Sequence, residues 1–161
     1  MPGYGLPKSK KGLLSWKWAE KKLASSREYW IITVRPDGRP HAMPVWGLWW
    51  NNVFYFSTGS NTRKTKNLDK NSHCVVATED AADAVILEGR AERVKDPSLI
   101  REFFPMYGRK YKWDMSGMKD DMISLKEPLF AVYPKVAFGQ IEKTFAKTAT
   151  RWNFSQGKKK A

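Results

Sequence analysis

The sequence predicts a mainly β domain in which many short antiparallel strands form a closed or split barrel. Runs of β-branched and aromatic residues recur along the chain, and Pro, Gly, Asn and Asp separate them. Few segments have helical periodicity. A chain of 161 residues, 42% of them hydrophobic, suits one domain with its own core. Because closure removes the exposed edges of short strands, a barrel is the expected arrangement.

The first elements are a surface helix and a β-hairpin. Residues 13–26 place charges between apolar side chains at a spacing that predicts a short helix at one end of the barrel. A strand over residues 28–34 follows and ends in the Arg-Pro-Asp-Gly turn of residues 35–38. The return strand covers residues 40–50, and Pro44 within it indicates a sheet edge or a bulge.

A third strand leads into a second helix. The dipeptide Asn51-Asn52 is a two-residue turn signal, and the strand 53–58 follows it. Residues 61–71 lose the alternation of a strand and carry helix-compatible Lys, Leu and Arg, with Asn61 or Thr62 as the N-cap. The chain is therefore expected to pass from a strand directly into a helix start.

The rest of the chain is predicted to form four more strands and one helix. The strands cover residues 73–79, 83–94, 128–141 and 148–154. From Gly89 onward, one face of the second of these strands is expected to meet water. Pro97 marks the start of a helix with apolar residues at helical spacing, which Pro105 interrupts. Residues 114–127 are predicted to be a polar loop that carries methionines.

Lys and Arg outnumber Asp and Glu, and the formal net charge of +13 favours a partner that carries phosphate or other negative charge. The basic residues concentrate in an N-terminal arm (residues 1–12), in residues 63–70, in residues 109–112 and in a C-terminal tail (residues 155–161). The arm and the tail are expected to be solvated ends of a single domain that spans residues 1–161. Binding of nucleic acid through these ends is a less favoured alternative.

Several classes of protein are excluded by residue type. The single cysteine, Cys74, lies in an apolar run, which excludes a disulfide framework and favours a reducing environment. His41 and His73 lack clustered carboxylates, so no metal site is expected. No apolar stretch has signal-peptide or membrane-spanning length, which predicts a cytoplasmic protein with no membrane partner. No catalytic triad, Walker sequence or Cys-x-x-Cys is present, so difficult chemistry has to come from a cofactor.

The most distinctive segment is residues 56–71 (FSTGSNTRKTKNLDKN), where a strand runs into a predicted helix. Its hydroxyls and cations are Ser57, Thr58, Ser60, Thr62, Arg63, Lys64 and Lys66. The free N–H groups at a helix start attract an anion, and Arg binds phosphate oxygens two at a time. The residues alone are compatible with a phosphate site, but they favour a polar loop with a solvated basic helix face.

The same segment resembles the pyridoxamine 5′-phosphate oxidase-like split barrels, the superfamily that includes the flavin/deazaflavin oxidoreductases. In that family, a strand that ends in aromatic-x-Thr runs into Ser/Thr-Arg-Lys, then a Leu and an Asn. This chain matches with Phe56, Thr58, Thr62, Arg63, Lys64, Leu68 and Asn71. The resemblance extends upstream through DGRPHAMPVW and downstream through VILEG, and it covers about residues 29–154.

The resemblance implies a split β-barrel of the FMN-binding type and a homodimer with the cofactor at the subunit interface. In this family the second strand lies along the cofactor ring, and the Arg and Lys hold its phosphate. The implied cofactor contacts are Met43, Pro44, Val45, Trp46, Ser57, Thr58, Thr62, Arg63, Lys64 and Asn67. Arg151 and Trp152 are expected to close over a cofactor bound by the neighbouring subunit, with a simple edge-strand role as the alternative.

Two differences from the oxidase itself predict another substrate, because Met43 and Leu48 stand where the oxidase has Arg and Lys. Residues 64–68 resemble the deazaflavin-using branch, so FMN and the deazaflavin coenzyme F420 both fit. Tyr107, Lys110 and Trp113 are expected to line the pocket of a small organic substrate, although an amphipathic helix with a snorkelling Lys also explains them. The expected activity is hydride transfer between the cofactor and that substrate. The alternative is a split barrel that binds flavin or haem without catalysis.

Overall fold

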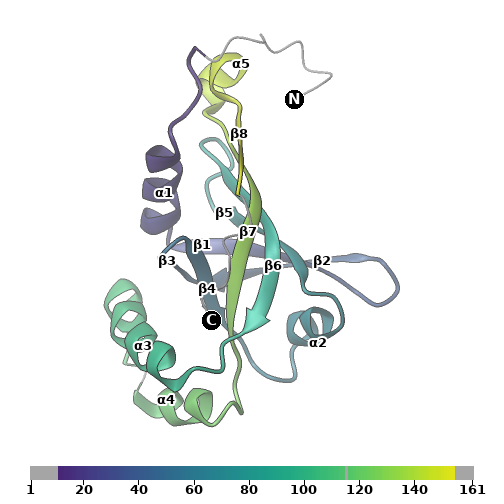
Figure 1. The fold of residues 1–161 in the computed structure, drawn as a ribbon, viewed down its shortest axis with the longest axis vertical. Helices are drawn as coiled ribbons and strands as arrows, with labels where there is room; N and C mark the ends of the chain where they lie inside the picture. The colour runs from purple at the N-terminus through teal and green to yellow at the C-terminus, as the bar shows by residue number, and fades with distance from the viewer. Residues whose placement is uncertain (1–10, 115, 155–161) are drawn as a thin grey trace.

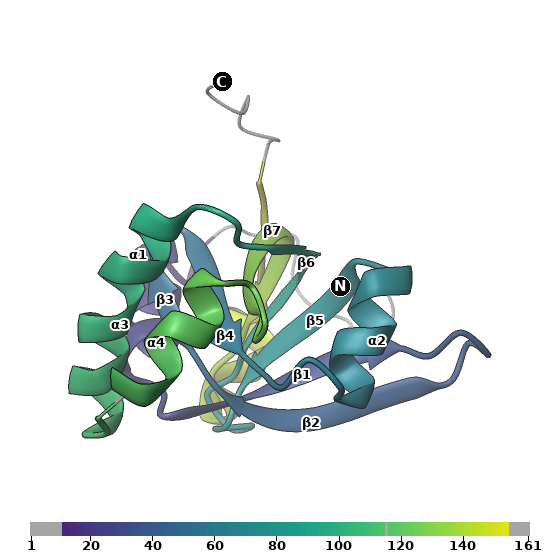
Figure 2. The same ribbon diagram turned by 90° about the horizontal axis from the view of Figure 1, so that it is seen from below.

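The computed structural model describes residues 11–114 and 116–154, and its central feature is one eight-stranded antiparallel sheet (Figure 1). The strands are β1 (Glu28–Val34), β2 (Pro40–Trp46), β3 (Leu48–Trp50), β4 (Val53–Ser57), β5 (His73–Thr78), β6 (Val85–Arg93), β7 (Leu129–Gly139) and β8 (Thr150–Asn153). Their order is β2-β1-β5-β6-β7-β4-β3, and β8 pairs with β7. The sheet curls into a half-barrel, so the predicted split-barrel fold is confirmed (Figure 2).

Helices lie on two sides of this sheet. They are α1 (Trp16–Ser25), α2 (Arg63–Lys70), α3 (Pro97–Tyr111), α4 (Ser116–Ile123), the 3-10 helix η1 (Glu142–Thr144) and α5 (Phe145–Thr148). In Figure 1, α1 and α3 lie on one side of the sheet, and α2 lies on the other. The helices predicted at residues 13–26 and 61–71 are confirmed as α1 and α2, with Thr62 as the N-cap of α2. No helix among the described residues is long and apolar enough to cross a membrane. The arm and tail fall almost wholly outside the described residues.

The β1–β2 hairpin forms as predicted, and β2 is an edge strand, which accounts for Pro44 inside it. The prediction of one strand over residues 40–50 is wrong, because the strand breaks at Gly47 into β2 and β3. β2 pairs with β1, whereas β3 pairs with β4 across the turn Asn51-Asn52, where both residues have positive φ. A Cβ at Gly47 would lie 2.2 Å from the Phe54 ring. The crossing from β2 to β3, where the chain changes its pairing partner, therefore requires glycine.

Two predictions for the region between β6 and β7 are wrong. α3 continues through Pro105 to Tyr111. Pro105 lies on the exposed face of the helix, where the Arg101 carbonyl that loses its N–H donor can bond to water. Residues 114–127, predicted as a loop, contain α4, which packs with α3 through the buried Met122. Because the α4 sequence is mostly polar, it has no apolar stripe that would predict a helix.

Two hydrophobic clusters flank β4, because successive side chains of a strand point to opposite faces. Phe54 and Phe56 belong to the cluster inside the half-barrel, which also contains residues of β1, β5, β6 and β7. Tyr55 belongs to the cluster formed with α3 and α4. The packing of α3 and α4 therefore fixes the same strand that ends at Ser57 and leads into α2.

Candidate functional site

The turn between β4 and α2 is held by a relay of threonine hydroxyls. Thr65 Oγ1 donates its proton to the Gly59 carbonyl (2.8 Å). The Thr65 hydroxyl oxygen therefore accepts from Thr62 Oγ1 (3.0 Å). Thr62 in turn accepts from Thr58 Oγ1 (3.1 Å) and from the N–H of Thr65, which caps α2. All three hydroxyl protons therefore point into the turn. Thr58 and Thr62 fix the shape of the turn and have no proton left to donate to a ligand.

Neighbouring elements hold the two serines of this turn. Glu127, which precedes β7, accepts the N–H of Ser60 (2.8 Å). Ser57 lies at the end of β4, and its hydroxyl bonds to that of Tyr107 on α3. Burial raises the pKa of Tyr107, and the bond from Ser57 partly opposes this effect. The turn is thus braced from the α4–β7 connection and from α3.

Four side chains that carry or can carry positive charge gather at the N-terminus of α2, and we call them the cationic cluster. Arg63 and Lys64 come from the first turn of α2, Arg35 from the β1–β2 turn and His41 from β2. Burial, followed by the charges of Arg35, Lys64 and Arg63, lowers the pKa of His41. Burial also lowers the pKa of Lys64. Within residues 11–114 and 116–154, neither Arg63 nor Lys64 has an acidic partner.

The same region contains buried polar atoms without hydrogen-bond partners in the described part of the chain. They are Arg35 Nε, His41 Nδ1 and Asn67 Oδ1. Asn67 is fully buried, and its amide donates to Thr33 Oγ1 (2.9 Å), which joins α2 to β1. An unpaired buried polar group costs free energy. Orphaned nitrogens beside unbalanced positive charge therefore fit a bound anion such as a phosphate group.

At the other end of β2, Trp46 lies in an aromatic group with α3. Its ring stacks on Tyr111 with 4.4 Å between centroids, and Trp113 meets it edge-on at 5.3 Å. Tyr107 lies 6.4 Å from the same ring. Tyr107 is buried, whereas 52% of Trp113 is exposed. Tyr107 and Trp113, two of the predicted substrate contacts, thus lie beside Trp46, a predicted contact of the cofactor ring.

Lys110, the third predicted substrate contact, is held by acceptors of the chain itself. Its Nζ donates to the Tyr29 hydroxyl (2.7 Å) and to the Gly47 carbonyl (2.9 Å). The ammonium also lies 4.7 Å from the centre of the Tyr29 ring. Burial lowers the pKa of Lys110 to about 8. This lysine therefore joins α3 to β1 and to the β2–β3 crossing.

Between these two ends, β2 exposes Met43 and Pro44 and buries the side chain of Val45 in the core. Figure 2 shows β2 passing α2 and reaching the side of the molecule that carries α3. Because successive side chains of a strand point to opposite faces, a ligand against one face of β2 would contact the side chain of either Met43 or Pro44, and only the backbone of Val45.

The predicted C-terminal contacts lie elsewhere in the single chain. Trp152 on β8 packs on Trp16, with 5.4 Å between ring centroids. Arg151 lies over the Phe138 ring at 5.7 Å. In Figure 1, β8 pairs with the upper part of β7, whereas α2 lies near the lower end of the sheet. A role for Arg151 and Trp152 over the cofactor therefore needs a second subunit, and it stays a prediction.

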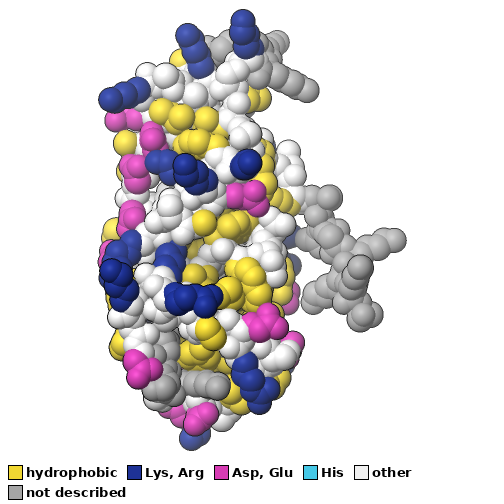
Figure 3. All heavy atoms as spheres, turned by 90° about the vertical axis from the view of Figure 1, so that its left-hand side faces the viewer, with side chains coloured by type: hydrophobic (Ala, Val, Ile, Leu, Met, Phe, Trp, Pro, Cys, Tyr) yellow, Lys and Arg dark blue, Asp and Glu magenta, His cyan; other side chains and the backbone are white. Residues whose placement is uncertain are grey.

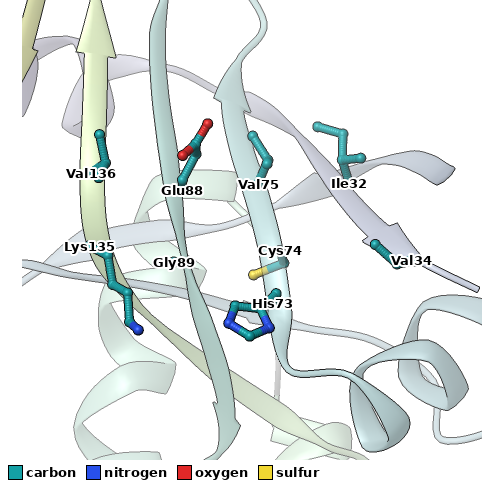
Figure 4. A pocket seen from close by; sticks show the side chains of 9 residues that line it. All are labelled: Ile32, Val34, His73, Cys74, Val75, Glu88, Gly89, Lys135 and Val136. Carbon is teal, nitrogen blue, oxygen red and sulfur yellow. The ribbon is translucent and has the colours of Figure 1, made fainter. Parts of the chain in front are cut away.

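A separate hollow of about 350 Å³ lies on the outer face of the sheet (Figure 4). Side chains of β1, β5, β6 and β7 line it, and most of them are apolar, such as Ile32, Val75 and Val136. His73, Glu88 and Lys135 add polar groups. None of the predicted site residues lines this hollow.

Arg35 and His41 are the members of the cationic cluster that the sequence did not indicate as site residues. Arg35 belongs to a predicted turn, and His41 is a lone histidine at a strand start. The hairpin places His41 opposite Thr33, which the turn length alone could indicate. The position of α2 above this pair depends on the buried contact of Asn67, which no local pattern predicts.

Comparison with known proteins adds a family and a set of similar folds. The family model described as pyridoxamine 5′-phosphate oxidase matches residues 17–135. No curated protein matches significantly. A conserved hypothetical protein from Mycobacterium tuberculosis has a TM-score of 0.73 at 20% identity, and the match covers 96% of this chain and 99% of that chain. An F420 reductase has a TM-score of 0.60 at 22% identity, with 73% of this chain and 94% of that chain covered.

HutZ, the haem storage protein from Vibrio cholerae, has a TM-score of 0.59 at 16% identity, with 73% of this chain and 88% of that chain covered. At these identities the solved structures establish the fold alone. The family model covers most of the chain, from α1 through the turn between β4 and α2 to β7. The chain therefore belongs to the pyridoxamine 5′-phosphate oxidase family, within the superfamily of split barrels of that type.

Proposed function

We propose that this protein is a flavin- or deazaflavin-dependent oxidoreductase that transfers hydride between bound FMN or F420 and a small organic substrate. The observation that carries the proposal is the cationic cluster at the start of α2, where Arg63 and Lys64 have no acidic partner within the described residues. Such a cluster costs free energy unless an anion neutralises it. Family membership supports a cofactor phosphate as this anion.

The chain's own residues then bind and orient the cofactor. The Arg63 guanidinium binds two phosphate oxygens at once, and the Lys64 ammonium adds a point charge. The start of α2 adds its dipole, while the threonine relay keeps the turn in one shape before binding. The cofactor, when bound, supplies the hydride chemistry. β2 would lie along its ring with Met43 on one face of the strand and Pro44 on the other, and Trp46 with Trp113 would close the far end.

A second copy of the chain completes the site. β1 and β5 carry apolar side chains on both faces, and strands of this kind are usually covered on both sides. The outward face includes Trp30, which is 45% exposed, and the apolar lining of the hollow in Figure 4. The family resemblance implies that Arg151 and Trp152 of a partner would then close over the cofactor. Analytical ultracentrifugation should give the mass of a dimer, and a monomer at micromolar concentration would contradict this part of the proposal.

The visible spectrum of the purified protein tests the proposal most simply. Bound flavin, deazaflavin and haem have different bands, so the spectrum also separates the haem-binding alternative. Protein purified without cofactor should bind added FMN or F420, with fluorescence reporting the titration. A colourless protein that binds neither would contradict the proposal, and a haem spectrum would favour the non-catalytic alternative.

Charge distribution disfavours the nucleic-acid alternative on one face. On the side that carries α1 and α3, Lys and Arg side chains are interspersed with Asp and Glu and with apolar patches (Figure 3). A nucleic-acid surface would need a continuous basic patch or stripe. Salt dependence of binding to a duplex would test the alternative directly, since phosphate contacts give a steep slope.

A further inference from the structure

His41 is the one member of the cationic cluster whose charge can change near neutral pH. It lies on β2 opposite Thr33 of β1, below the start of α2. The Nδ1 of His41 and the Nε of Arg35 are both buried, and neither has a hydrogen-bond partner within the described residues. A doubly protonated imidazole donates from both nitrogens, so a negative charge close to His41 favours this form.

The charges that act on His41 come from each element packed around it, and all of them are positive. Arg35 acts from the β1–β2 turn, and Arg63 and Lys64 act from α2. The acidic residues of these segments are engaged elsewhere, because Asp37 pairs with Arg39 and Asp69 pairs with Arg93. Glu127 bonds to the N–H of Ser60 in the neighbouring turn.

We propose that His41 takes up a proton when an anion binds to the cationic cluster, so that this site holds its ligand more tightly as the pH falls. Without an anion, burial and three neighbouring cations keep the imidazole neutral at pH 7. A doubly charged anion offsets most of the charge of these three cations, which favours the protonated imidazole. This inference rests on the proposed function, because it uses the same anion site.

Linkage sets the size of the effect. If the anion raises the pKa of His41 by about one unit, its affinity is about tenfold higher below both pKa values than above them. His41 is therefore a positioning residue whose charge adjusts to the charge of the ligand.

Histidine NMR tests the inference on the intact protein, because the chain has only two histidines. The exposed His73, which bonds to Asn71, is an internal control. We expect the His41 pKa to lie below 6.5 in the free protein and to rise by about one unit with saturating FMN. If FMN leaves the titration of His41 unchanged, the inference is wrong.

Sulfate is a second probe, because it keeps a double negative charge between about pH 5.5 and 8 and cannot itself cause a pH effect. At constant ionic strength, its affinity for the protein should rise severalfold as the pH falls through this range, and it reaches the full rise of about tenfold only below the pKa of free His41. His41→Gln should remove this dependence, whereas His73→Gln should keep it.

The two experiments separate failure of the inference from failure of the proposed function. FMN and sulfate that bind with no pH dependence would overturn the inference and leave the proposed function intact. If neither ligand binds at any pH, both are wrong. A dependence that persists in His41→Gln would assign the proton to another group and also overturn the inference.

Discussion

Each end of β2 has a partly buried lysine, but the two lysines have different partners. Lys110, at the aromatic end, donates to the Tyr29 hydroxyl and the Gly47 carbonyl. Lys64, at the start of α2, has no acidic partner within the described residues and shares its surroundings with Arg35, Arg63 and His41. Burial lowers the pKa of both lysines. The chain thus satisfies one lysine with its own acceptors and leaves the other without an acidic partner, and we propose a ligand only beside the second.

The largest expected effect is the loss of cofactor binding in Arg63→Ala/Lys64→Ala. Each charge-assisted hydrogen bond contributes about 1.5–3 kcal/mol, so the affinity for FMN or F420 should fall by more than about 100-fold. The melting temperature of the free protein should stay the same or rise, because repulsion within the cluster is removed. Fluorescence titration and thermal unfolding measure the two quantities.

Lys66→Ala/Lys70→Ala is the matched control, since both lysines are exposed on the same helix. This control should bind the cofactor within about threefold of the wild type, because exposed charges interact weakly. Equal losses in the two double variants would indicate a general charge effect and not a built site.

At the aromatic end, the largest effect should be on stability. The Tyr111 hydroxyl accepts the buried Gly47 N–H (2.7 Å) and donates to the Arg27 carbonyl (2.7 Å). Tyr111→Phe leaves that N–H unpaired, so the free energy of unfolding should fall by about 1–3 kcal/mol. Chemical denaturation measures the loss, and the exposed Tyr133→Phe serves as the control. If Tyr111→Phe is as stable as the wild type, the aromatic end of β2 does not have the structural role that we assign to it.

The turn between the two regions should respond more weakly to substitution. Thr62→Ala removes the N-cap of α2 and the middle of the hydroxyl relay, which should lower the free energy of unfolding by about 1 kcal/mol. Thr62→Ser keeps the hydroxyl and should recover most of this loss. If both variants lose the same stability, the methyl group and not the hydroxyl is responsible.

A further effect is the pH dependence of stability that Lys110 confers. Its folded-state pKa of about 8 lies below its ordinary value of 10.5, so the unfolded chain binds more protons between these values. Stability should therefore rise with pH from about 8 to 9.5. Near pH 10 the buried tyrosines oppose this trend, since burial raises the pKa of Tyr111 to about 12. Denaturation at several pH values should show a slope that Lys110→Met flattens and Lys66→Met keeps.

The sequence predicted the parts of the molecule whose signal is local. Alternating strands, the Asn51-Asn52 turn and the Thr62 cap depend on neighbouring residues, and the structure confirms them. The break at Gly47 depends on the approach of the Phe54 ring from another strand, and α3 passes Pro105 because that residue is exposed.

The same distinction holds for the candidate site. Arg63 and Lys64 belong to a contiguous motif that the sequence makes visible. Arg35 and His41 join them only through the hairpin register and the packing of α2 over β1. Placement of Arg151 and Trp152 over a cofactor depends on a second chain, which no pattern within one chain can supply.

A crystal structure of the protein with bound FMN tests the central claim most directly. The account predicts the phosphate within hydrogen-bond distance of the Arg63 and Lys64 side chains, with Lys110 still bonded to Tyr29 and Gly47. A phosphate bound at Lys110, or in the hollow on the outer face of the sheet, would contradict it.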